Sequence, residues 1–187
     1  SHYPIDENVA KTKELVAVAH AMGMSIEAEV GSIGGEEDGV VGMGECADPD
    51  ECKRVADLGV DMLAAGIGNI HGKYPANWKG LSFETLAAVQ ELTGELPLVL
   101  HGGSGAGEEN IRKAVACGIN KINVCTDLMR HATNASIATL TENPQIDYMD
   151  LCIAVEDAMK DFIKSYMRVI GSSGQYSFEK HNGPELD

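Results

Sequence analysis

The sequence LPLVLHGGSGAGEENIRKAVACGINKINV, residues 96–124, decides the fold because it contains one complete strand–helix–strand unit. A run rich in β-forming residues covers 96–100, a helical pattern covers 108–117, and a second β-forming run covers 121–124. Alternation of this kind is typical of parallel strands joined by helices that cover the sheet. We therefore expect an α/β fold with a parallel sheet.

The same alternation continues on both sides of this unit and gives about four strands. Their spacing of roughly 25–35 residues suits the βα units of a (β/α)8 barrel or of a doubly wound sheet. A full barrel takes about 250 residues, so four strands predict an open sheet or part of a barrel. Asp48, followed by Pro49, and Ser82 are expected helix caps. The other expected elements are strands over 25–31 and 62–70, helices over 8–22, 48–58, 82–93, 128–140 and 148–170, and a loose tail over 171–187.

The composition narrows the classes of partner. The net charge is −15, whereas nucleic acids and anionic membranes are bound through basic patches, so neither is an expected partner. No apolar run reaches the roughly 20 residues that span a membrane, and the first residues do not resemble a signal peptide. The five cysteines form no Cys-x-x-Cys pair, so we expect reduced thiols in a cytoplasmic protein.

Polar side chains gather at the expected carboxyl ends of the strands, where parallel α/β folds place functional groups. His71 and His101 each precede a glycine at such an end, and Glu29 lies at the end of the first strand. Two imidazoles and a carboxylate suit zinc, and three protein ligands with one open position are typical of catalytic zinc. A lone histidine at a strand end is more often structural, so spacing alone leaves both interpretations open.

Two glycine-containing stretches also allow two interpretations each. Backbone amides of residues 102–105 (GGSG), together with hydroxyls of Ser104 and Thr126, could bind a phosphate beside a helix N-terminus. A tight turn that needs permissive backbone angles explains the same glycines equally well. The acidic stretch 34–39 (GGEEDG) is by composition a solvated loop, but it could also be a lid that carries an acid or base into the site.

Taken together, these segments resemble the class II (zinc-dependent) ketose-bisphosphate aldolases. The resemblance covers residues 1 to about 170 and implies a (β/α)8 TIM barrel, of which this chain covers about the C-terminal half, strands 5–8. The whole of 1–187 is then a single, incomplete barrel domain. The matching strings are SHYP at 1–4, EAEVG at 27–31, GGEEDG at 34–39, GNIHG at 68–72, LHGGSG at 100–105 and KINV at 121–124.

The resemblance implies a role for each candidate site residue. His71 and His101 would be zinc ligands, and Glu29 a carboxylate near the metal. Glu37, less surely Glu36, would act as the acid in proton transfer at the ketose carbon. Residues implied to contact substrate are Asn123, which holds the enediolate, and the phosphate-binding Gly72, Gly102, Gly103, Ser104 and Thr126, with a monovalent cation (Na⁺ or K⁺) beside them.

The implied activity is reversible cleavage of a ketose 1,6-bisphosphate into dihydroxyacetone phosphate and glyceraldehyde 3-phosphate by a homodimer or homotetramer. Cys125 stands where fructose-bisphosphate enzymes often have Asp and tagatose-bisphosphate relatives a small residue, which leaves the epimer open. Lys121 begins its expected strand, far from the catalytic end, so Schiff-base chemistry is disfavoured.

One part of the family's site has no match. The family carries another zinc histidine next to a catalytic aspartate, and these 187 residues contain no adjacent Asp–His pair. Two alternatives therefore stay open. One is a catalytically incomplete chain that retains metal and phosphate binding, and the other is a different phosphate-handling barrel enzyme, such as a metal-free isomerase.

Overall fold

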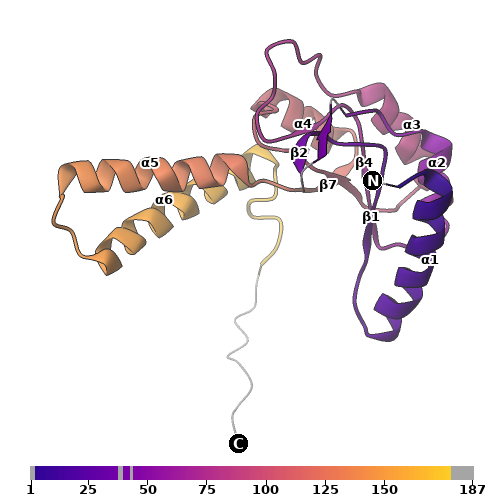
Figure 1. The fold of residues 1–187 in the computed structure, drawn as a ribbon, viewed down its shortest axis with the longest axis horizontal. Helices are drawn as coiled ribbons and strands as arrows, with labels where there is room; N and C mark the ends of the chain where they lie inside the picture. Colours follow the sequence, from indigo (N-terminus) through magenta and orange to yellow (C-terminus); the bar gives the residue numbers. More distant parts are fainter. Residues whose placement is uncertain (1–2, 38–39, 43, 178–187) are drawn as a thin grey trace, which may run out of the picture. The chain divides into compact units, whose positions relative to one another are not determined.

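The structure is a computed structural model that describes residues 3–37, 40–42 and 44–177. The chain divides into two compact units, Ser1–Arg130 and His131–Asp187. The first unit contains the sheets and is built from alternating strands and helices (Figure 1). The second consists mainly of helix.

Four parallel strands form the main sheet. They run in the order β1-β4-β6-β7, which is also their order along the chain. This confirms the expected α/β fold, and strands in this order with intervening helices form part of a (β/α)8 barrel. The bounds are β1 Glu27–Val30, β4 Met62–Ala65, β6 Leu98–Leu100 and β7 Ile119–Ile122. The helices of this unit are α1 Ile5–Ala21, α2 Pro49–Ala56, α3 Phe83–Thr93 and α4 Glu108–Ala116.

The two faces of this sheet differ in polarity. Along β1, Ala28 and Val30 are buried, while Glu27 and Glu29 are partly exposed and point to the opposite face, as the period of two in a strand requires. The buried face belongs to a core of aliphatic side chains from strands and helices. Its fully buried large members include Leu63, Ile67, Leu86, Leu98, Leu100 and Ile111.

A second, smaller sheet corrects two expectations. Its strands are β2 (Gly34–Glu37), β3 (Val40–Gly42) and β5 (Ile70–His71), in the order β3-β2-β5. The acidic stretch 34–39, expected as a loop or lid, therefore begins with a strand, and its last two residues lie outside the described part of the chain. The expected strand 62–70 is split, because β4 ends at Ala65.

Two glycines lie where the chain leaves the strand. A Cβ on Gly66 would lie 2.7 Å from the carbonyl oxygen of Glu45, and Gly68 has a φ of 85°. The chain therefore turns out of the sheet after Ala65 and forms β5 only after this turn. The β7 strand also lies two residues earlier than expected, so that Asn123 follows the strand rather than belonging to it.

The second unit contains a pair of helices. Helix α5 (Thr126–Glu142) begins in the first unit, and α6 (Tyr148–Val169) follows it. The rings of His131 and Phe162 pack with centroids 4.4 Å apart. Within the described range no helix is both long and apolar enough to cross a membrane. The expected tail 171–187 lies partly outside the described residues.

The expected caps are confirmed, and one yields a stability prediction. The Asp48 carboxylate accepts hydrogen bonds from the backbone amides of Asp50 (2.8 Å) and Glu51 (3.3 Å). We expect Asp48→Ala to lower the free energy of unfolding by about 0.5–2 kcal/mol, because these amides lose their acceptor. Asp48→Asn is the matched control, since its amide oxygen still accepts. Equal losses in urea unfolding of the two variants would contradict the assigned role.

Candidate active site

A pocket of about 410 Å³ lies where the segments after β5, β6 and β7 come together. These three segments are far apart in sequence. Those after β6 and β7 meet because these parallel strands end at the same edge of the main sheet, while His71 and Gly72 come from the end of β5 in the smaller sheet. Seven of the residues expected from the sequence to form a site line this pocket. The full lining is His71, Gly72, His101, Gly102, Ser104, Asn123, Val124, Cys125 and Thr126.

The other expected residues lie in different places. Glu29 does not line the pocket, but its Oε2 lies 3.6 Å from Nδ1 of His101. Gly103 is buried, and its amide donates to the carbonyl oxygen of Asn123 at 3.1 Å. Glu36 and Glu37 belong to β2, which pairs with β5 beside His71, but their side chains lie outside the description.

The turn after β6 has no room for a side chain. Gly102 has a φ of 64°, and a Cβ there would lie 2.3 Å from the carbonyl oxygen of Ile70. The Tyr74 hydroxyl donates to the Gly102 carbonyl at 2.6 Å and accepts from the Ile70 amide at 3.2 Å. Burial raises the pKa of Tyr74 above its ordinary value, so the hydroxyl keeps its proton. Tyr74 thus joins the two turns that carry His71 and His101.

Asn69 also holds the turn that carries His101. It is fully buried, its Oδ1 accepts from the Ile67 amide at 2.9 Å, and its Nδ2 donates to the His101 carbonyl at 2.9 Å. Neither Asn69 nor Tyr74 was predicted from the sequence. A polar residue inside the apolar run 62–70 was a signal for Asn69, because a buried amide needs hydrogen-bond partners.

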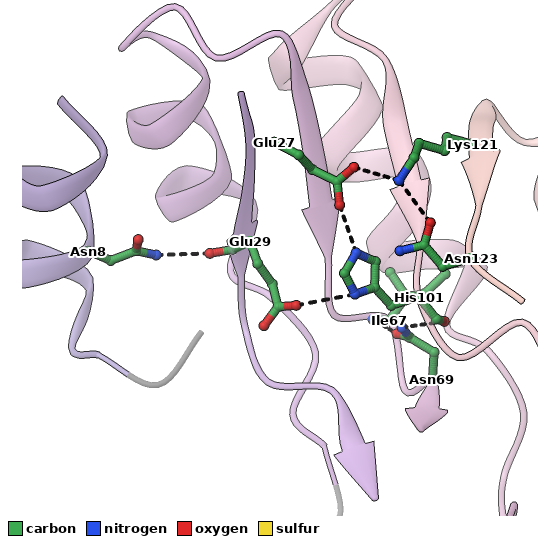
Figure 2. Close-up of polar contacts among 8 residues, drawn as sticks. All are labelled: Asn8, Glu27, Glu29, Ile67, Asn69, His101, Lys121 and Asn123. Atoms are coloured by element: carbon green, nitrogen blue, oxygen red, sulfur yellow. Dashed lines mark hydrogen bonds and ion pairs between the residues drawn. The ribbon is translucent and has the colours of Figure 1, made fainter. Parts of the chain in front are cut away.

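The polar face of the sheet carries a connected set of side chains (Figure 2). Glu27 Oε1 lies 2.8 Å from Nε2 of His101, and Glu27 Oε2 lies 2.8 Å from Nζ of Lys121. The same ammonium donates to Oδ1 of Asn123 at 2.8 Å. Burial raises the pKa of Glu27, but hydrogen bonds from Lys121 and His101 outweigh it, so that its pKa lies below the usual value. Glu27 is therefore a carboxylate near neutral pH.

Neither Glu27 nor Lys121 was predicted as a site residue. The expectation that Lys121 begins its strand, far from the catalytic end, is wrong, because β7 starts at Ile119 and the Lys121 ammonium contacts Asn123 at the pocket. The available signal was the period of two in a strand, because Glu27 shares a face with Glu29 and Lys121 lies two residues before Asn123. The contact itself joins the two outer strands, β1 and β7, and no local sequence pattern reports it.

The donors present suit zinc in chemical type. The rings of His71 and His101 are stacked, with centroids 5.7 Å apart. An ionised Glu27 can only accept, so Nε2 of His101 donates to it. In the neutral imidazole, Nδ1 then directs a lone pair toward Glu29, an arrangement that a cation would stabilise. Among the described residues, however, no three His, Cys, Asp or Glu side chains form a complete metal cluster.

Comparison with known proteins identifies the family. The model of the family "Fructose-bisphosphate aldolase class-II" matches residues 1–175. The chain belongs to the class II fructose-bisphosphate aldolase family. The fructose-bisphosphate aldolase of Mycoplasma pneumoniae is 44% identical over 182 residues, which cover 94% of this chain and 63% of that protein. The Streptococcus pyogenes serotype M1 enzyme is 50% identical over 136 residues, 73% of this chain and 46% of that protein.

Solved structures agree with this family. The YdjI aldolase of Escherichia coli K12 superposes with a TM-score of 0.77 at 31% identity, over 95% of this chain and 60% of that one. A candidate fructose-1,6-bisphosphate aldolase from Coccidioides immitis gives a TM-score of 0.81 at 33% identity, over 93% and 61%. The resemblance stated from the sequence is therefore confirmed. This aldolase-family chain spans less than two thirds of each of these relatives.

The close contact at Gly102 yields a prediction with an internal control. We expect Gly94→Ala to cost about 1–2 kcal/mol, because φ there is also 64° but nothing lies within 4 Å of the new Cβ. Gly102→Ala should cost about 1–3 kcal/mol more, because its Cβ meets the Ile70 carbonyl. Denaturant unfolding measures both variants. Equal losses would show that the turn after β6 is not restricted by Ile70.

Proposed function

We propose that this chain contributes half of the active site of a class II aldolase that reversibly cleaves a ketose 1,6-bisphosphate. The products are dihydroxyacetone phosphate and glyceraldehyde 3-phosphate, and fructose 1,6-bisphosphate is the first substrate to test, with tagatose 1,6-bisphosphate next. The observation that carries the proposal is the pocket that combines both His-Gly turns, the GGSG turn and Asn123.

The metal in this proposal is Zn²⁺, held by His71 and His101 with Glu29 beside them. Bound zinc supplies Lewis-acid polarisation of the ketose carbonyl. Asn123 contributes by orientation: its Oδ1 accepts from Lys121, so its NH₂ group is left to donate to the oxygens of the enediolate. Glu37, less surely Glu36, moves the proton at the ketose carbon.

In this proposal the turns around the pocket bind the phosphate. The chain has a net charge of −15, which repels anions, so the hydrogen-bond donors must come from these turns. The Ser104 Oγ accepts from the Asp127 amide at 3.1 Å, so its hydroxyl hydrogen can donate to a phosphate oxygen. Thr126 is the first residue of α5, where backbone amides lack partners within the helix and attract anions. Gly72 and Gly102 allow close approach. Gly103 stays in the proposed set as a backbone support, since its own amide is used internally.

The proposal also covers the smaller partners of the site. A Na⁺ or K⁺ ion beside the phosphate would be bound by oxygen ligands of these turns, and the assembly would be a homodimer or homotetramer. Cys125 lines the pocket, so comparing fructose and tagatose 1,6-bisphosphate as substrates tests whether this position selects the epimer.

A catalytically incomplete chain is the second candidate, and two observations favour it. The 187 residues contain no adjacent Asp–His pair, and the described residues form no complete three-ligand cluster. Such a chain would retain weak metal and phosphate binding without turnover. A different phosphate-handling barrel enzyme is less favoured, because a metal-free isomerase has no need of two histidines at one pocket.

Zinc affinity is the first test. We expect calorimetry to show Zn²⁺ binding that His71→Ala combined with His101→Ala abolishes, because imidazoles supply most of the available ligands. The control is His20→Ala, which removes a histidine that pairs with Asp61 outside the pocket. Identical zinc affinity in the wild type and the double variant would rule out this metal site.

Turnover is the second test. In a coupled assay, this chain alone should cleave fructose or tagatose bisphosphate near the background rate, because general acid–base assistance is worth about 10²–10⁴-fold. Adding a class II aldolase segment that carries the adjacent Asp–His pair should restore activity, and a chelator should remove it. In that mixture Asn123→Ala should lower turnover about 10²-fold or more.

Two outcomes of the assay would contradict these expectations. Strong chelator-sensitive cleavage by the chain alone would show that its own residues supply the missing acid–base group. Failure of every complementing segment, with zinc binding intact, would favour the catalytically incomplete chain.

A further inference from the structure

Glu27 and Lys121 have no role in the function proposed above, yet they connect two residues that do. Glu27 contacts His101 through one carboxylate oxygen and Lys121 through the other, each at 2.8 Å. Lys121 in turn donates to Asn123 at 2.8 Å. The result is an unbroken chain of four side chains, His101–Glu27–Lys121–Asn123, across the polar face of the sheet (Figure 2).

The position of this chain in the fold is unusual for an ion pair. Glu27 lies on β1 and Lys121 on β7, the two outer strands, with β4 and β6 between them. Outer strands of a flat four-stranded sheet would lie about 14 Å apart, at roughly 4.8 Å per step. In the register of the sheet, Lys121 aligns with Val99 on β6 and Val99 with the small Ala64 on β4, while Ala64 aligns with Glu29 on β1. The contact between Glu27 and Lys121 therefore requires that the sheet be curved and that no large side chain of β4 or β6 stand between them.

Stability alone does not account for these residues. The Lys121 side chain is 43% exposed and that of Glu27 is 22% exposed, and ion pairs in contact with solvent contribute little to folding. Their hydrogen bonds, in contrast, restrict two side chains that each have more than one usable orientation. A histidine can carry its proton on either ring nitrogen, and an asparagine amide can present either its oxygen or its NH₂ group.

We propose that Glu27 and Lys121 are positioning residues, Glu27 for the ring of His101 and Lys121 for the amide of Asn123. The proposal rests on the proposed function, in which His101 holds zinc and Asn123 contacts substrate. Glu27 selects the tautomer with the proton on Nε2, which leaves Nδ1 as the metal-binding nitrogen. Lys121 can only donate, so it selects the Asn123 orientation in which the NH₂ group faces the pocket.

This arrangement matches the chemistry of metal-binding histidines, which commonly donate their second ring N–H to a carboxylate. Loss of such a partner typically weakens metal affinity about 10–100-fold. Lys121 also holds Glu27 from the side opposite His101. Loss of the lysine should therefore weaken zinc binding as well, but by less than loss of Glu27.

The direct test needs no metal and no activity. In the wild-type chain with ¹⁵N-labelled histidine, the pH is raised until the His101 nitrogen shifts stop changing, and those shifts should then report the Nε2–H tautomer. Glu27→Gln should shift the ring toward a mixture of tautomers, since a neutral amide is a weaker acceptor. Lys121→Met should move the side-chain amide signals of Asn123. A wild-type His101 protonated on Nδ1 alone would overturn the proposal without any variant.

Zinc calorimetry on the full chain is the second readout. We expect Glu27→Gln to weaken Zn²⁺ binding about 10–100-fold with little change in thermal unfolding. Glu156→Gln is the matched control, because Glu156 pairs with Lys160 on α6 at 2.7 Å, outside the pocket, and its loss should leave zinc affinity unchanged.

The outcomes separate the two proposals. If the wild type binds zinc and Glu27→Gln changes neither the affinity nor the His101 tautomer, the positioning role is wrong and the proposed function stands. If His101→Ala binds zinc as tightly as the wild type, the metal site of the proposed function fails, while the tautomer measurement still decides the role of Glu27. Should Glu27→Gln fail to fold, the tautomer of His101 in the wild type decides the role by itself.

Discussion

Four parallel strands in one sheet determine where the candidate site of this chain lies. Glu27 and His101 are 74 positions apart in sequence, yet their side chains meet on the polar face of the sheet, where Glu27 begins β1 and His101 follows β6. The pocket lies where the segments after β6 and β7 meet the end of β5 from the smaller sheet. The helices pack on the other face of the sheet, so the polar face can carry functional side chains. Barrels of this kind usually have helices outside and functional residues at the strand ends.

The turns at that edge are held by groups without reactive roles. Gly102 leaves space for a carbonyl, Tyr74 joins two turns, and Asn69 satisfies backbone groups around His101. The consequence is that the positions of the histidines depend on hydrogen bonds to the main chain, which are made before any ligand arrives. A preorganised site of this type loses less freedom on binding than one assembled from loose loops.

Much of this structure was predictable because its signals are local. Strand and helix alternation predicted the parallel sheet, and Asp48 and Ser82 cap their helices as short polar side chains do. The split of 62–70 was not predictable, because the backbone at Gly66 passes too close to the carbonyl of Glu45 for a side chain, and Glu45 is remote in sequence. The contact between Glu27 and Lys121 was not predictable from the sequence for the same reason, since it depends on the curvature of a sheet of four strands.

The open sides of β1 and β7 have a consequence for handling the protein in solution. Within the described part of the chain each of these strands pairs on one side only, so backbone groups remain that another strand could recognise. Solubility then depends on the balance between association through these strand edges and the repulsion between molecules that each carry a net charge of −15. Exposed Lys121 on β7 opposes indiscriminate strand addition, because charged side chains on an edge disfavour aggregation. High salt weakens that repulsion and leaves the strand edges unchanged, so concentrated salt is the condition under which this chain is most prone to precipitate.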